Sequence, residues 1–133
     1  MYHVTTCTKD RRPHFDDPAC ARMVIREMRG LHDNGWLSSF AWVLMPDRLH
    51  WLFELGPSYP LDRTLKRLKG RSGQALGHSL QRSGPIWQPG YHDHALRCEE
   101  DVQVIARYII ANPLRAGLVS RIGDYPWWDA VWL

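Results

Sequence analysis

The sequence predicts an α+β fold, a ferredoxin-like βαββαβ antiparallel sheet with helices on one face, followed by a C-terminal helix. The chain of 133 residues is long enough for one ordinary core but short for two. Stretches with strand-like alternation and stretches with helical spacing of apolar residues follow one another in that order. We therefore expect residues 1–133 to form a single domain, with residues 123–133 packed on it as an aromatic tail.

A strand and a helix are predicted first. Residues 2–8 are rich in β-branched side chains and lead into a charged, proline-containing loop. Asp16 or Asp17 is a plausible N-cap with Pro18 just inside the helix. Apolar residues then recur at intervals of three and four. The pair Asn34-Gly35 tolerates positive φ, so it should end this helix.

Residues 36–45 and 48–55 are predicted to form a hairpin around a Met-Pro-Asp corner. Polar and apolar residues alternate from residue 48 to residue 55, which is the period of a half-buried strand. Every second side chain of a strand projects from the same face. Arg48 and His50 should therefore project together, on the face opposite Trp51.

The second half is predicted to hold a long helix, a short strand and a last helix. Residues 61–80 keep helical spacing although two glycines weaken the middle. Residues 91–97 are short enough for a fourth strand. The last helix should run from about Glu99 to Asn112, with acidic residues 99–101 in its first turn. Pro113 should close it, because proline disfavours a helical residue before it.

The end of the chain carries unusual aromatic area. Tyr125, Trp127, Trp128 and Trp132 fall within residues 123–133. Such large apolar side chains favour a tail that folds back onto the domain, and base stacking is the alternative.

Charge and cysteine content limit the classes of protein. The net charge is only +3, but Lys66, Arg67, Lys69 and Arg71 fall within six residues and could contact phosphates. The alternative for this cluster is a solvated helix face. The three cysteines lack CxxC spacing, which argues against a disulfide framework and a cysteine zinc site. The sequence has no signal-like or membrane-spanning stretch, so a cytoplasmic location without a membrane partner is expected.

Three segments together resemble a known family. Met-Pro-Asp-Arg-Leu-His at 45–50, the stretch 86–97 and the stretch 108–119 resemble, in order and spacing, the single-tyrosine transposases. More narrowly, they resemble the REP-associated tyrosine transposases of bacteria. This resemblance covers nearly the whole chain and implies the same ferredoxin-like fold with a C-terminal catalytic helix.

The resemblance also implies an activity. Such a transposase would cut and transfer single-stranded DNA at repeat-element hairpins with an adjoining single strand, as a monomer or homodimer, through a covalent 5′-phosphotyrosine intermediate. Tyr108 matches the nucleophile, and His50 matches one histidine of a motif that binds Mg²⁺ or Mn²⁺. Asn112 could be a further metal ligand or only a helix cap before Pro113. The residues expected on DNA phosphates are Lys66, Arg67, Lys69, Arg71, Arg97 and Arg115.

Arg48 departs from the family pattern, because the resemblance places the first metal-binding histidine there. A guanidinium has no free lone pair and would repel a neighbouring cation. Two alternatives follow for Arg48. Either the protein is a catalytically impaired hairpin-DNA-binding form with a weakened or absent metal, or Arg48 meets the scissile phosphate as a fixed positive charge. A third hypothesis, from another class, is a ferredoxin-like module that binds a small ligand or a protein.

The other histidines give weaker signals. His92 and His94 have strand spacing and would share a face, which suits either a metal pair or a surface that faces DNA. His3, His14, His32 and His78 lack partners at ligand spacing, so surface positions are expected for them.

Overall fold

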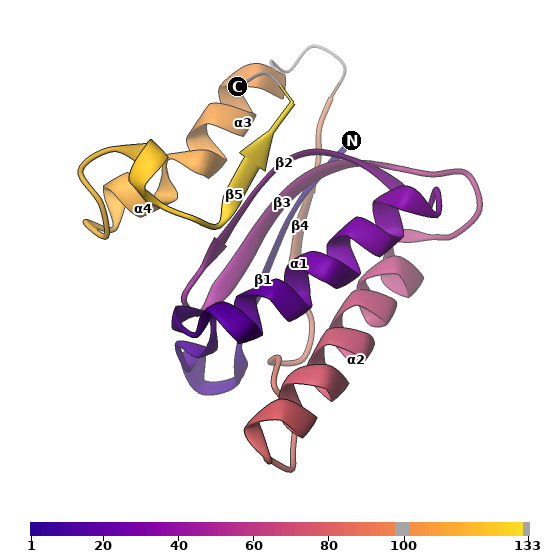
Figure 1. The fold of residues 1–133 in the computed structure, drawn as a ribbon. Helices are drawn as coiled ribbons and strands as arrows, with labels where there is room; N and C mark the ends of the chain where they lie inside the picture. The colour runs from indigo at the N-terminus through magenta and orange to yellow at the C-terminus, as the bar shows by residue number, and fades with distance from the viewer. Residues whose placement is uncertain (98–101, 132–133) are drawn as a thin grey trace.

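The core of the structure is one antiparallel sheet with helices on both faces. The computed structural model describes residues 1–97 and 102–131 (Figure 1). Its strands are β1 (Tyr2–Cys7), β2 (Leu37–Met45), β3 (Arg48–Leu55), β4 (His92–Ala95) and β5 (Trp128–Ala130). They lie in the order β4-β1-β3-β2-β5. The first four strands have the predicted ferredoxin-like order, and β5 extends the sheet beyond β2.

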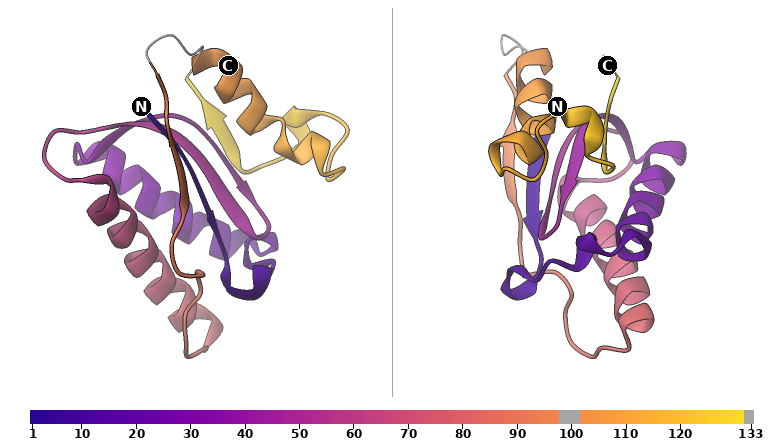
Figure 2. Two further views of the ribbon diagram at one scale, coloured as in Figure 1. Left: turned by 180° about the vertical axis from the view of Figure 1, so that it is seen from behind. Right: turned by 60° about the vertical axis from the view of Figure 1, so that its left-hand side comes forward.

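The two predicted long helices cover one face. Helices α1 (Pro18–Asp33) and α2 (Leu61–Leu80) lie together on that face. The right view of Figure 2 shows the sheet nearly edge-on with both helices on one side of it. Asp17 caps α1 by accepting a hydrogen bond from the backbone N–H of Ala19 at 3.0 Å. Trp51, Phe53 and Leu49 of β3 are buried in the apolar cluster beneath these helices. The alternation in the sequence therefore correctly identified this core face.

The opposite face carries a second apolar cluster. Helix α3 (Val102–Ile110) packs there, with Ala106, Ile109 and Ile110 buried against Leu52 of β3 and Val43 of β2. Helices thus cover both faces, because the C-terminal helix crosses to the side that α1 and α2 leave open (Figure 2). His50 precedes Leu52 by two residues on β3, so its side chain projects toward the face on which α3 packs.

The C-terminal helix is divided differently from the prediction. Pro113 does not end helical structure, because a short helix, α4 (Asn112–Arg115), starts just before it. A proline is tolerated in a first helical turn, where its missing N–H has no partner in any case. The predicted acidic first turn, residues 99–101, lies outside the described residues.

The tail residues that the structure describes pack onto the second cluster. Tyr125 is buried there, and its hydroxyl donates a 2.6 Å hydrogen bond to the backbone carbonyl of Leu44. Burial and nearby carboxylates raise the pKa of Tyr125 to about 12. Trp127 and Trp128 are partly buried beside it, and β5 was not predicted because only three residues form it. Trp132 lies outside the described residues.

Within residues 1–97 and 102–131, no helix combines the length and the apolar character that crossing a bilayer requires.

We predict that Tyr125→Phe lowers the free energy of unfolding by about 1–2 kcal/mol, because it removes a buried hydrogen bond to a backbone carbonyl. Urea unfolding followed by circular dichroism measures the difference. Tyr108→Phe is the matched control, since Tyr108 is 61% exposed and loses only a solvated hydroxyl. Equal stability of the two variants would contradict the structural role of the Tyr125 hydroxyl.

Candidate active site and DNA-binding surface

The hairpin corner holds a charged cluster around His50. Asp47, the last residue of the corner, accepts from Arg11 and from Arg48 at 2.8 Å each. Arg48 Nε also donates to His50 Nε2 at 3.2 Å, and Thr5 Oγ1 lies 3.1 Å from His50 Nδ1. Arg48 is therefore held in place by a carboxylate on one side and an imidazole on the other.

The hydrogen bonds define the protonation state of His50. Because the Arg48 guanidinium only donates, His50 Nε2 must accept, which leaves the proton of the neutral imidazole on Nδ1, facing Thr5. Burial, helped by His3, Arg48 and Arg115 and opposed by Asp47, lowers the pKa of His50 to about 3. His50 is thus neutral, and its Nε2 accepts a hydrogen bond from Arg48.

His3 is a neighbour of His50 that the sequence did not reveal. Its ring lies 5.7 Å from the His50 ring, and its Nε2 is buried without a hydrogen-bond partner. Burial, with a smaller effect of His94, lowers the pKa of His3. The expected surface position for His3 is therefore wrong. Strand β1 lies between β3 and β4 and pairs His3 with both Leu52 and His94, and only that sheet order could have revealed the contact.

His92 and His94 lie on the edge strand β4, opposite Thr5 and His3 of β1. Cross-strand partners share a face of the sheet, so both histidines project toward the side of His50. Both are exposed. The described ranges contain no group of three His, Cys, Asp or Glu side chains that could hold a metal ion.

Tyr108 lies near the end of α3 and is largely exposed. The guanidinium of Arg115, in α4, lies over the Tyr108 ring at 3.9 Å from its centroid. Arg115 is also close enough to His50 to help lower the pKa of that imidazole. In the described part of the chain no hydrogen bond joins Tyr108 to His50. Arg115 contacts the tyrosine ring, and its charge acts on His50.

Asn112 is tied to the helix end. Its side-chain Nδ2 donates to the carbonyl of Ile109 at 2.7 Å, and Asn112 begins α4. Tyr108 and Asn112 are four residues apart, and α3 ends between them, at Ile110. Arg115, three residues after Asn112 in α4, has its guanidinium against the Tyr108 ring.

The donor set at the corner does not fit a divalent cation. Position 48 carries a guanidinium, and that guanidinium uses the Nε2 lone pair that His50 would offer to a metal. A cation there would also face Arg11, Arg48 and Arg115, and the carboxylate of Asp47 is already paired with Arg11 and Arg48. The positive charge of this site therefore comes from arginines.

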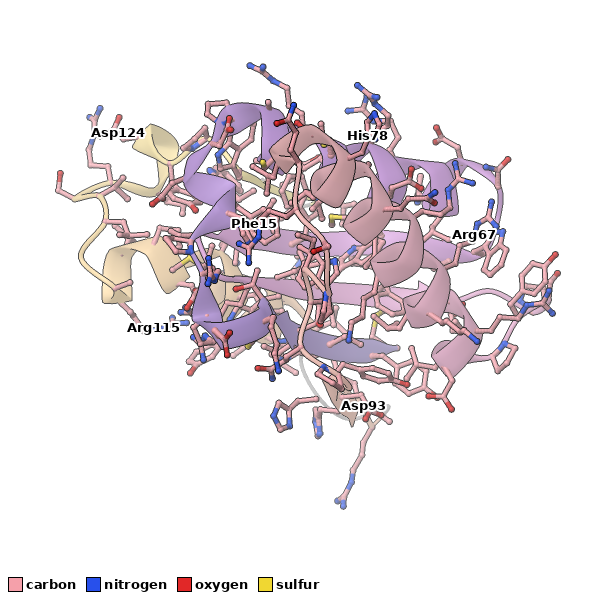
Figure 3. The ribbon with its side chains drawn as sticks, turned by 90° about the horizontal axis from the view of Figure 1, so that it is seen from below. Phe15, Arg67, His78, Asp93, Arg115 and Asp124 are labelled. Atoms are coloured by element: carbon pink, nitrogen blue, oxygen red, sulfur yellow. The ribbon has the colours of Figure 1, made fainter. Side chains whose placement is uncertain are left out.

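The four basic residues predicted to bind phosphate on α2 have different environments. Lys69 donates to the carbonyls of Gln88 and Gly90 at 2.8 and 2.6 Å, and burial lowers its pKa. Arg71 forms an ion pair with Glu27 at 2.8 Å. Lys66 and Arg67 are exposed, as is Arg97 just beyond β4. Figure 3 shows Arg67 and Arg115 at opposite ends of the molecule.

Comparison with known proteins gives consistent matches. The sequence model of the family described as "Transposase IS200 like" matches residues 1–112. A REP-associated tyrosine transposase of Escherichia coli (strain K12) is 30% identical over 87 residues, which are 65% of this chain and 50% of the relative. The chain thus spans about half the length of the curated relative it matches.

Solved structures agree on the fold. A REP-associated tyrosine transposase bound to a REP hairpin superposes with a TM-score of 0.78 at 22% identity, over 96% of this chain and 74% of the other. A transposase-like protein of Deinococcus radiodurans has a TM-score of 0.60 at 25% identity, over 81% of this chain and 86% of the other.

We predict that folding stability falls as the pH drops below 6.5, the ordinary histidine pKa, toward the folded-state His50 pKa of about 3. In this interval the unfolded chain takes up a proton that folded His50 does not bind. His50→Gln should therefore show a smaller loss of unfolding free energy between pH 7 and acidic pH, measured by urea denaturation. An identical pH dependence in both proteins would refute this assignment.

Proposed function

The chain belongs to the IS200-like transposase family, and on this premise we propose that it cuts and transfers single-stranded DNA at hairpins with an adjoining single strand. The hairpin substrate is supported by the REP hairpin that the structural relative binds. The tyrosine chemistry is supported by the name of the curated relative, a tyrosine transposase. Tyr108 is the proposed nucleophile.

One observation carries the assignment of Tyr108. Its exposed phenol lies under the guanidinium of Arg115, and the same guanidinium acts on His50 at the corner. A phosphate bound to Arg115 would therefore lie close to the Tyr108 hydroxyl and to the corner residues around His50. Arg48 donates a hydrogen bond from Nη1 to Asp47 and another from Nε to His50. Its Nη2 is therefore left to donate to a non-bridging phosphate oxygen.

The proposed reaction is an in-line displacement at phosphorus. The Tyr108 oxygen forms a bond to phosphorus and loses its proton, while the bond from phosphorus to the 3′ oxygen breaks and that oxygen takes up a proton. The cut strand is then joined to the protein through its 5′ phosphate. Arg115 and Arg48 would stabilise the negative charge that develops on the phosphate oxygens.

A second candidate function is hairpin binding without cleavage. The specific observation in its favour is the hydrogen bond from Arg48 to His50 Nε2, which takes the lone pair that His50 would offer to a catalytic cation. In this case the arginines would bind DNA phosphates but would not promote attack by the tyrosine. The two functions differ in one readout, the covalent adduct.

Tyr108→Phe is predicted to abolish the covalent protein–DNA adduct and to keep hairpin affinity within about twofold, because it deletes only the nucleophilic oxygen. A labelled hairpin with a single-stranded tail is incubated with each protein and separated on a denaturing gel. Gel shift measures binding in parallel. An adduct that persists in Tyr108→Phe would exclude this tyrosine as the nucleophile. Binding without an adduct in the unaltered protein would establish the second candidate.

Arg48→His is predicted to make the protein responsive to Mn²⁺ or Mg²⁺, because it removes the guanidinium and frees His50 Nε2 beside a second imidazole. Calorimetry should detect Mn²⁺ binding by the variant and much weaker binding by the unaltered protein. Adduct formation by the variant should rise by about tenfold or more with metal, which is at least about 1.4 kcal/mol. Arg48→Gln is the control, since it removes the charge without adding a ligand nitrogen. Equal Mn²⁺ binding by both variants would contradict the role assigned to position 48.

A further inference from the structure

A cation–aromatic cluster lies on the side of the molecule that carries α1 and α2. Trp36, just before β2, stacks on Tyr59, just before α2, with ring centroids 3.7 Å apart and planes inclined by 18°. Two arginines of α2 lie over these rings. Arg63 is 4.9 Å from the Tyr59 centroid and Arg67 is 5.0 Å from the Trp36 centroid. We call these four residues the arginine–aromatic stack.

The stack is built on a rigid part of the backbone. Trp36 N–H donates to Leu31 O at 3.0 Å, at the end of α1, and Trp36 O accepts from Gly56 N–H at 2.9 Å. A Cβ at Gly56 would collide with the carbonyl oxygens of Gly35 and Trp36, so this close approach requires glycine. The backbone of Trp36 is therefore held between the end of α1 and the segment after β3. Its ring and that of Tyr59 give Arg63 and Arg67 a surface to lie over, which reduces the freedom those side chains have left to lose on binding a ligand.

The charges of this surface are available to a ligand. In the described part of the chain, no carboxylate forms an ion pair with Arg63, Lys66 or Arg67, whereas Arg71 is paired with Glu27. Arg63 and Arg67 are four residues apart on one helix, so their side chains start roughly 5–6 Å apart on the same side. This spacing along the helix suits successive phosphates of one strand.

The stack lines an open groove of about 1140 Å³. Its lining includes both aromatic rings, the three free cations and Gly70, at which a Cβ would meet nothing within 4 Å. Arg67, and with it this groove, lies at the far end of the molecule from Arg115 (Figure 3). A ligand in the groove is therefore bound away from Tyr108.

We propose that this groove binds a single-stranded segment of DNA outside the cleavage site. Arg63, Lys66 and Arg67 bind successive phosphates, and the edges of Trp36 and Tyr59 contact unpaired bases. A double-stranded stem would present phosphates but no free base to the aromatic edges, so the combination of arginines with aromatic rings favours a single strand. The inference rests on the proposed function, because it takes DNA as the substrate, and it adds a second contact that tethers the strand.

The test uses the double variant Arg63→Gln/Arg67→Gln and the control Arg26→Gln/Arg29→Gln. The control removes the same charge from exposed positions of α1, outside the groove. Fluorescence anisotropy measures the affinity of each protein for a labelled 15-nucleotide oligo(dT) and for a blunt hairpin without a tail. Salt is varied between 50 and 200 mM, and circular dichroism checks that each variant is folded.

We expect the groove variant to bind oligo(dT) about tenfold more weakly at the lower salt, with a log–log salt slope smaller by about 1.4, as the loss of two contacts with a single strand predicts. The control should stay within about twofold of the unaltered protein. A further variant, Tyr59→Leu, keeps every charge and should also weaken oligo(dT) binding several-fold, because it removes the ring that supports Arg63.

Three results would overturn the proposal: no oligo(dT) binding by the unaltered protein, equal losses in the groove variant and its control, or an equal loss for the tailless hairpin. The adduct assay on the tailed hairpin is independent of these readouts. If the protein forms the Tyr108 adduct but fails the oligo(dT) test, the proposed cleavage function stands and the proposal for the groove is wrong. If the protein binds oligo(dT) as expected but forms no adduct, the proposal for the groove stands and the proposed cleavage is wrong.

Discussion

The two-sided burial of β3 is the constraint on which the structure depends. This central strand sends Leu49, Trp51 and Phe53 into the cluster beneath α1 and α2, and Leu52 into the cluster beneath α3. The apolar residues on both faces fix the register of β3, because a shift by one residue would exchange the two faces. His50 and Arg48 therefore have to project toward the side of α3, where the C-terminal segment brings Arg115 and Tyr108.

The corner resolves a conflict between burial and charge. A half-buried histidine beside several arginines cannot hold a proton near neutral pH, and it becomes a hydrogen-bond acceptor for Arg48 instead. Asp47 balances part of the charge by pairing with Arg11 and Arg48. The result is a positive site organised by hydrogen bonds between side chains. Such a site is suited to an anionic group such as phosphate.

The basic residues of α2 show how one charged run divides between structure and surface. Lys69 connects α2 to the loop before β4 through two carbonyls, and Arg71 connects α2 to α1 through Glu27. The charges of both residues are thus engaged by other groups of the protein. The guanidinium groups of Arg63 and Arg67 instead lie over an aromatic pair, which leaves their charge unneutralised. Similar residues in one helix thus pair with other groups of the fold or keep their charge at the surface, according to what lies opposite them.

The sequence by itself determined the order of elements, the faces of β3 and the family. Alternation and helical spacing are local properties of the chain, and they predicted β3 and α2 at their observed bounds. Local pattern also placed Arg48 beside His50. It could not show that Arg48 would occupy the Nε2 lone pair of His50, because that depends on rotamers held by Asp47 across the corner.

Only the tertiary structure decided the contacts between distant segments. His3 meets His50 because β1 pairs with β3, and Arg115 meets Tyr108 because the chain turns into α4 at Asn112. Trp36 and Tyr59 stack because the end of α1 and the end of β3 converge on the start of α2. Each of these contacts joins residues whose spacing in the sequence carries no periodic signal. They follow from the packing of whole elements around the sheet, which no local pattern encodes.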